Sequence, residues 1–289
     1  MKENLNKIKK LINLFLPPIF LKLKKNKNVI FKTYKNYDDA VKNSNTYEND
    51  DLVKVIASKG LQYKNFLASK NNKDLANLGS HQISKLLSLI SNCEMKENSI
   101  NILDFGGGAG HHYFLLKKLL NENITINWVV FETEELVKKC KELGLENPEL
   151  KFTSNFRCNL IQNTKFDVLY ANYSLAYTNE PYLFLQNLLE LNFKKFYITN
   201  TALNDKNDQD VVGVQKSDLA TNGVGRTIPT NLKLRNKTVF YPFTVMSEKR
   251  FENLLNKYTT IVFKVKEEQI SYVTDKGSFS LFGYLLTKL

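Results

Sequence analysis

The stretch SINILDFGGGAGHHYFLLKKLL, residues 99–120, contains an apolar run, a glycine cluster and an amphipathic segment in that order. The run at 99–105 is typical of a buried parallel strand, and the residues after the cluster have helical apolar spacing. Glycines are needed where a backbone turns sharply and lets a ligand approach without a Cβ in the way. The stretch therefore predicts a strand, a ligand-binding turn and a helix that begins near His111.

The same alternation continues along the chain. Further strand-like runs are separated by amphipathic helical segments, which is the pattern of βαβ units and a parallel sheet. We expect a Rossmann-like α/β fold of about seven mostly parallel strands, with helices on both faces and an antiparallel C-terminal strand pair. Ser247 is a plausible N-cap for the last helix, and 202–231 is predicted to be a long loop. The first five strands are expected at 99–105, 126–132, 150–154, 166–172 and 194–200.

Three regions follow from composition. Residues 1–28 form a basic amphipathic segment, 29–98 a helical prefix or lid, and 99–289 the ligand-binding domain. Residues 1–27 hold eight lysines and one acid, so they carry most of the net charge of +12. Because the remainder is nearly balanced, nucleic acid is not expected as a partner. The segment can contact an anionic membrane or pack on the domain; its apolar stretch is too short to span a bilayer.

The cysteines and histidines point to no metal site. The three cysteines include no CxxC pair, and two of the three histidines are adjacent. Neither a disulfide framework nor a metal centre is indicated. Lysines flank the apolar stretch of residues 1–27 on both sides, unlike a signal peptide. A cytoplasmic protein is expected, with peripheral contact to the inner membrane face if the N-terminal segment binds lipid.

Three features identify the ligand expected at the glycine cluster. His111 stands where a dinucleotide fingerprint requires its last glycine, which disfavours NAD. Asp104, two residues before the first glycine, suits a cationic ligand better than a pyrophosphate. Glu132 ends the next strand, where a carboxylate can accept hydrogen bonds from ribose hydroxyls. A cationic amino-acid end, a ribose and an adenine together describe S-adenosylmethionine.

ILDFGGGAG followed by VVFE resembles the first motif of class I S-adenosylmethionine-dependent methyltransferases. The stretches VIFKTYKNYDDAV, YSLAYTNEPYLFLQNL, VQK and YPFTVMSEKRFENLL are similar to a methyltransferase family of bacterial surface-polysaccharide gene clusters. That resemblance implies a sugar or lipid-linked glycan acceptor. Several members have an acid where Ser154 stands here. The cofactor-binding residues it implies are Asp104, Phe105, Gly106, Gly107, Gly108, Gly110, Glu132, Ser154, Asn155, Asn172 and Tyr173.

Two residues are candidates for catalysis. Tyr177 follows the fourth strand at the carboxyl edge, where open α/β sheets bind ligands, and His111 can act as a base at a helix N-terminus. Each has an alternative, as a packing aromatic and as a polar residue that starts a helix. Pro242 lies in a segment that can line the substrate pocket or turn on the core. Two other functions stay open: an RNA methyltransferase, and a methyltransferase-like protein that binds without turnover.

Overall fold

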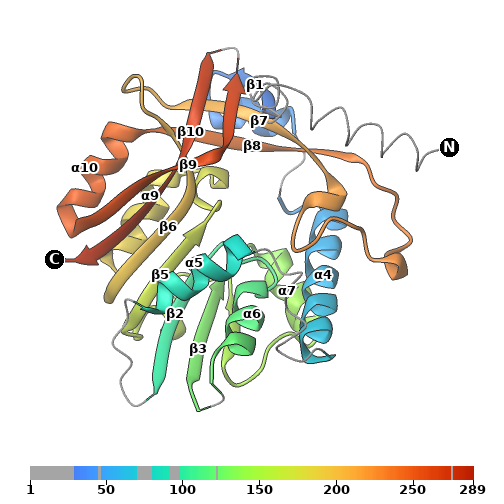
Figure 1. Cartoon of the computed structure of the whole chain (residues 1–289). Helices are drawn as coiled ribbons and strands as arrows, with labels where there is room; N and C mark the ends of the chain where they lie inside the picture. The colour runs from blue at the N-terminus through green and yellow to red at the C-terminus, as the bar shows by residue number, and fades with distance from the viewer. Residues whose placement is uncertain (1–28, 45–46, 70–79, 92–97, 122, 275) are drawn as a thin grey trace, which may run out of the picture.

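The computed structural model describes residues 29–44, 47–69, 80–91, 98–121, 123–274 and 276–289 (Figure 1). The N-terminal segment of residues 1–27, with its expected membrane contact or packing, lies outside the described residues. In the part of the chain that is described, no helix is long and apolar enough to cross a membrane.

The centre of the molecule is a parallel sheet in the strand order β4-β3-β2-β5-β6. All five strands are those predicted from the apolar runs. Their burial explains the sequence pattern, since β5 is buried at every position except its last. The Rossmann-like α/β fold expected from the sequence is thus confirmed. The strands are β2 (Ser99–Phe105), β3 (Thr125–Phe131), β4 (Leu150–Thr153), β5 (Phe166–Asn172) and β6 (Phe193–Asn204).

Helices cover both faces of this sheet (Figure 1). Alternate residues of β2 point to opposite faces, so Ile102 packs in one hydrophobic cluster and Leu103 in the other. The first cluster includes residues of α4 (Asp50–Ser69), α5 (Ser80–Ser91), α6 (His111–Leu119) and α7 (Glu134–Glu142). The second includes residues of α8 (Asn159–Gln162), α9 (Pro181–Glu190) and α10 (Glu248–Tyr258).

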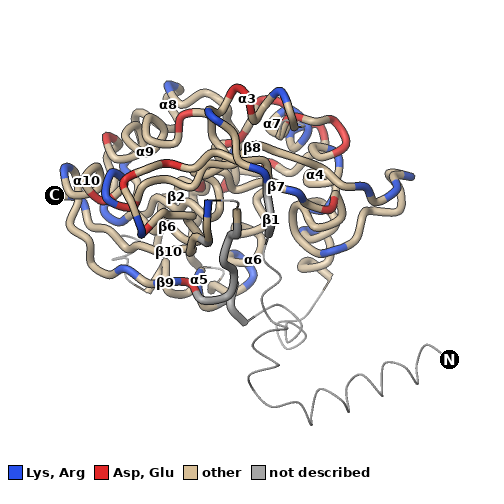
Figure 2. The backbone as a smooth tube through the Cα atoms, turned by 90° about the horizontal axis from the view of Figure 1, so that it is seen from above, with Lys and Arg blue, Asp and Glu red and all other residues tan. Residues whose placement is uncertain are grey.

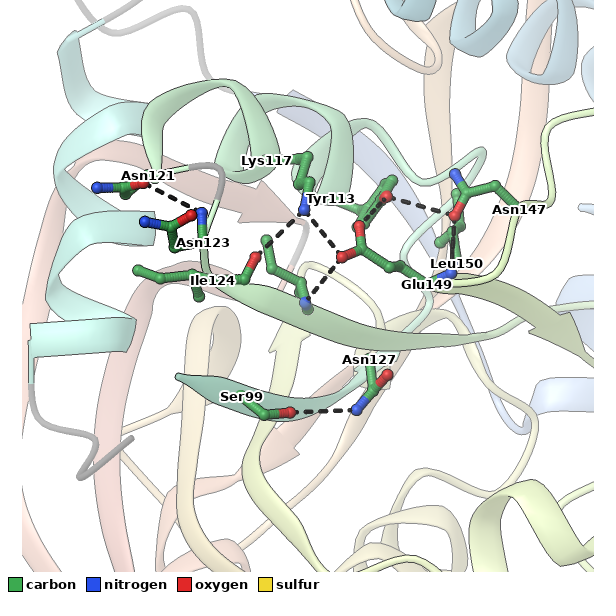
Figure 3. Close-up of polar contacts among 11 residues, drawn as sticks. Ser99, Tyr113, Lys117, Asn121, Asn123, Ile124, Asn127, Asn147, Glu149 and Leu150 are labelled. Carbon is green, nitrogen blue, oxygen red and sulfur yellow. Dashed lines mark hydrogen bonds and ion pairs between the residues drawn. The ribbon is translucent and has the colours of Figure 1, made fainter. Parts of the chain in front are cut away.

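The far end of α6 is fixed by a polar cluster around Glu149 (Figure 3). Lys117 Nζ donates to Glu149 Oε1 at 2.8 Å, and the Tyr113 hydroxyl donates to Glu149 Oε2 at 2.9 Å. The backbone N–H of Ile126, in β3, also donates to this carboxylate. The cluster therefore ties α6 to the start of β3 and so fixes the helix whose other end begins at the glycine loop.

Five further strands extend the sheet to ten, where about seven were expected. The pairings β6-β10-β9-β1-β7-β8-β6 close into a ring of six strands. Its interior is apolar and includes Ala202, Phe243, Val245, Phe279 and Leu281. The added strands are β1 (Val29–Tyr34), β7 (Val211–Asp218), β8 (Thr238–Ser247), β9 (Thr259–Thr274) and β10 (Gly277–Lys288).

Four strands of this ring correct or confirm the sequence predictions. β1 lies in a stretch expected to be mainly helical, and β7 lies inside the predicted loop 202–231. The two strands pair with each other, with Lys32 opposite Val214, and each has a second partner, β9 for β1 and β8 for β7. The predicted antiparallel C-terminal pair is present as β9 and β10. Ser247 is the N-cap of α10, since its side chain accepts from Arg250 N at 3.2 Å.

Charged residues of both signs are interspersed around the described chain (Figure 2). Many of them form ion pairs between elements, such as Lys194 with Asp167 at 2.7 Å and Arg250 with Asp210 at 2.7 Å. Exposed pairs of this kind contribute on the order of 0–1 kcal/mol each. The basic and acidic residues are therefore mixed over the surface of the described residues.

Candidate functional site

The glycine loop joins β2 to α6 and requires glycine at three positions. Gly106, Gly108 and Gly110 have φ values of +70°, +60° and +75°, a region that other residues adopt only with strain. A Cβ on Gly106 would lie 2.3 Å from Ser174 Cβ, so the loop also packs closely on the segment after β5. The sequence GGGAG is therefore explained by the shape of this turn.

Asp104 lies beneath the loop. Its side chain is fully buried, and Oδ2 is 3.1 Å from His112 Nδ1. A Cβ on Gly107 would come within 2.3 Å of the same oxygen, which explains a glycine at that position too. Among the described residues, Asp104 Oδ1 has no hydrogen-bond partner although it is buried. A buried acceptor without a donor is rare and indicates a missing ligand or water.

Glu132, at the end of β3, meets the loop from the side. Its Oε1 accepts from Gly108 N at 2.9 Å and its Oε2 from Thr133 N at 3.0 Å. Burial raises the pKa of Glu132, and the hydrogen bonds from Thr133 and Gly108 oppose that change. The carboxylate thus holds two backbone N–H groups beside the turn, at the sheet edge where ligands bind in open α/β folds.

A cavity of about 850 Å³ opens above these groups. It is large enough for a nucleotide-sized ligand and a small second molecule. Its walls come from the glycine loop, the carboxyl ends of β3 and β5, the α3–α4 region and the turn after β7; α3 spans Tyr37–Lys42. Of the predicted site residues, those that line it are Phe105, Gly106, Gly108, His111, Glu132, Ser154, Asn172, Tyr173 and Tyr177.

Four predicted cofactor residues do not line the cavity. Asp104 and Gly107 form the support under the loop, as described above. Gly110 faces the interior, where a Cβ would lie 3.1 Å from a Leu150 methyl carbon. The Asn155 side chain accepts from Arg157 N at 2.9 Å and stabilises the turn after β4.

The two candidate catalytic residues have different surroundings. The Tyr177 hydroxyl donates to Gln215 Oε1 at 2.8 Å. The centre of its ring lies 5.3 Å from the ring centre of Tyr47 and 4.9 Å from that of Phe243. This places Tyr177 in an aromatic wall. Burial, together with the neighbouring His112, lowers the pKa of His111 well below 6.5. A neutral imidazole that lines the cavity can accept a proton.

At the end of β5, Asn172 and Tyr173 are held by the next strand. Thr199 Oγ1 donates to Asn172 Oδ1 at 2.8 Å, and Tyr173 N donates to Thr199 O at 3.2 Å. Tyr173 has a positive φ of 56°, which is uncommon for a bulky residue. Such conformations concentrate at functional sites, where the surrounding structure holds them in place.

Several wall residues escaped sequence reasoning. Tyr37 and Tyr47 precede the glycine motif by more than fifty residues, so their approach to it depends on the tertiary fold. Pro242 belongs to β8 and lines the cavity, the first of the two alternatives for its segment. The turn of residues 221–224 also lines it and lies within the loop predicted at 202–231, but nothing in that stretch of sequence pointed to these residues.

No protein-family model and no curated protein matches the chain. Solved structures that it resembles include the methyltransferase CcbJ from Streptomyces caelestis, at 11% identity and a TM-score of 0.47, with 84% of this chain and 98% of that chain covered. An S-adenosylmethionine-dependent methyltransferase from Clostridium acetobutylicum ATCC 824 aligns at 15% identity and a TM-score of 0.41, over 80% and 97% of the two chains.

A third resemblance is to geranyl diphosphate C-methyltransferase from Streptomyces coelicolor A3(2), solved with Mg²⁺, geranyl diphosphate and S-adenosyl-L-homocysteine. It aligns at 10% identity and a TM-score of 0.45, covering 74% of this chain and 82% of that chain. At these identities and scores, the ligands of those proteins carry no information about the ligand of this chain. The function of this chain is therefore argued from its own residues.

Proposed function

We propose that this protein is an S-adenosylmethionine-dependent methyltransferase. The observation that carries the proposal is the junction at which Glu132 accepts from Gly108 N, beside a glycine loop that opens into the cavity. A carboxylate at the end of β3 suits the two hydroxyls of a ribose, and the positive-φ glycines suit close approach of a ligand to the backbone. Ser174 lines the cavity, and its Oγ has no hydrogen-bond partner among the described residues, which fits a ligand that brings hydrogen-bond donors.

Each part of the site then has a role. The glycine loop, with Asp104 beneath it, would hold the amino-acid end of the cofactor. Glu132 would bind its ribose, and Ser154 would lie near its adenine. Asn172 and Tyr173 would stand near the transferred group. When bound, S-adenosylmethionine supplies an electrophilic methyl group on a positively charged sulfur. Because such a transfer is an in-line displacement, the chief work of the protein is to position the two reactants.

We propose a sugar or glycan intermediate of bacterial surface-polysaccharide synthesis as the acceptor. The wall formed by Tyr37, Tyr47 and Tyr177, with Asn179 and Asn222 beside it in the cavity, supports a ring that has both apolar and hydroxyl faces. Where the acceptor is a hydroxyl, His111 is the candidate general base, since its imidazole is neutral and lines the same cavity.

Calorimetric titration with S-adenosylmethionine and S-adenosylhomocysteine tests the cofactor. The wild type should bind both, and Glu132→Ala should lose at least a factor of ten in affinity, about 1.4 kcal/mol. Glu142→Ala is the matched control, because Glu142 is an exposed carboxylate at the end of α7. A folded wild type that binds neither compound would overturn the proposal.

Acceptors are then screened with radiolabelled cofactor against nucleotide sugars, glycan lipids and RNA. Label transferred to a sugar supports the proposed acceptor class. Label transferred only to RNA would overturn that class while keeping the methyltransferase.

A further inference from the structure

Lys59 is a buried lysine on α4, with 3% of its surface exposed. Its ammonium donates to three backbone carbonyl oxygens: those of Ala220 and Asn222 at 2.7 Å each, and that of Gly225 at 3.3 Å. Within the described chain no carboxylate forms an ion pair with it. Burial lowers the pKa of Lys59 to about 8, so the group still carries its charge at neutral pH. A buried charge held by three carbonyls is costly to place and implies a specific task.

The three carbonyls belong to one turn after β7. In this turn, residues 219–225, four residues line the cavity: Thr221, Asn222, Gly223 and Val224. Gly223 has a φ of +72°, and a Cβ there would lie 3.3 Å from Ile56 Cα. The turn is therefore pressed against α4, and Lys59 is the side chain of α4 that joins it by hydrogen bonds.

The same part of α4 also contacts the glycine loop. A Cβ on Gly60 would lie 2.3 Å from Ala109 Cβ, and one on Gly108 would lie 3.8 Å from an Ile56 methyl carbon. Residues 56–60 thus touch both the loop under the proposed cofactor and the turn that forms another wall of the cavity. A displacement of either contact changes the width of the cavity.

We propose that Lys59 is a positioning residue, whose ammonium fixes the turn 219–225 as a wall of the ligand cavity and thereby strengthens ligand binding without touching the ligand. The ligand part of this inference rests on the proposed function. The fixing of the turn does not, because it follows from the hydrogen bonds alone.

The test compares Lys59→Met with Lys64→Met. Methionine keeps about the length and the apolar stem of lysine but removes the ammonium, so the three carbonyl oxygens of the turn lose this donor. Lys64 is the matched control: it is partly exposed, lies on α4 and also donates to a backbone carbonyl, that of Gly144 at 3.0 Å, away from the turn.

Trypsin cleavage after the exposed Arg226, directly beyond the turn, reports whether the wall is fixed. Native-state cleavage there should be at least ten times faster in Lys59→Met than in Lys64→Met, while cleavage after Lys257 in α10 changes equally in both. Equal rates at Arg226 would overturn the inference. Faster cleavage at every site in Lys59→Met alone would also overturn it, because that pattern shows general destabilisation.

Titration with S-adenosylhomocysteine tests the consequence for binding. Affinity should fall about tenfold in Lys59→Met and stay unchanged in Lys64→Met, and ligand should slow cleavage at Arg226 in the wild type. Unchanged affinity in a variant whose turn is released would refute the effect on binding. If the wild type itself fails to bind, the proposed function is wrong, and the cleavage rates still decide whether Lys59 fixes the turn.

Discussion

Replacing Gly60 by alanine should weaken ligand binding more than it destabilises the fold. The new Cβ would lie 2.3 Å from Ala109 Cβ and 3.1 Å from Ala109 O, whereas carbon atoms in contact sit about 3.5–4.0 Å apart. α4 cannot easily withdraw, because its residues Leu52, Val55 and Ala57 are buried against the core. To relieve the contact, Ala109 in the glycine loop must therefore move rather than α4.

Two opposing effects set the size of the change in stability. Overpacking costs about 1–3 kcal/mol, while alanine in a helix interior is favoured over glycine by about 1 kcal/mol. The free energy of unfolding should thus fall by about 2 kcal/mol at most. Affinity for S-adenosylhomocysteine should fall at least tenfold, because a shift of Ala109 also moves Gly108 and Gly110 on either side of it and so changes the shape of the ligand loop.

Urea unfolding, followed by the fluorescence of the single, buried Trp128, gives the stability, and calorimetry gives the affinity. Gly144→Ala is the control, since Gly144 has a φ of +64° with no atom within 4 Å of the added Cβ. It should lose about 1–2 kcal/mol of stability and no affinity. The double change Gly60→Ala, Ala109→Gly removes the 2.3 Å contact, leaves the milder one with the carbonyl oxygen at 3.1 Å, and should restore most of the binding. Wild-type affinity in Gly60→Ala, or no recovery in the double variant, would refute the reasoning.

Three further predictions concern stability and pH. Ser247→Ala removes the N-cap of α10 and should cost about 1 kcal/mol in urea unfolding; no change would show that Arg250 N finds another acceptor. At Glu149, burial raises the pKa, but the hydrogen bonds from Lys117, Tyr113 and Ile126 outweigh it and hold the pKa below 4.5. The wild type should therefore lose stability as pH falls below about 4.5. Glu149→Gln should lose less stability over the same range. Equal slopes would contradict this. Burial, with the neighbouring His112, keeps the pKa of His111 in the folded protein well below 6.5. As pH drops below 6.5 the unfolded chain therefore binds a proton at this residue that the folded protein does not, and the free energy of unfolding should fall. His111→Gln should flatten that decline between pH 7.5 and 5.5, and an imidazole that titrates near 6.5 by NMR would contradict it.

The central sheet and the glycine loop could be predicted because their signals are local. Strands such as β5 are apolar at nearly every position, and Gly106, Gly108 and Gly110 report a turn that other residues adopt only with strain. β1 reads VIFKTY, a short strand-like run, but it opens a region whose other residues have helical spacing, and β7 gave no comparable signal. β7 reads VVGVQKSD, with one glycine and a polar second half, and it becomes a strand through its partners.

The cavity wall could not be predicted for a related reason. Lys59 stands in a helical segment with two other lysines, Lys54 and Lys64, and in the sequence it looks like a solvated side chain. Only the fold shows that it is buried and holds three carbonyls of a turn more than 150 residues away. Tyr47 likewise reaches Tyr177 across a long separation in sequence.

The ring of six strands also sets an order of folding. The five parallel strands lie in one continuous stretch, 99–204, so they can pair as soon as that stretch has been synthesised. β1 cannot pair until β7 has been synthesised. Its second partner, residues 272–274 of β9, lies about 240 residues after β1 in the chain. Because such long-range pairings form slowly, we expect the glycine-loop half to fold first and the wall with Tyr177 and Pro242 to close last. Ribosome-bound chains that end after residue 204 but before β7 should therefore bury Trp128, while β1, whose partners β7 and β9 have not yet been made, stays open to protease.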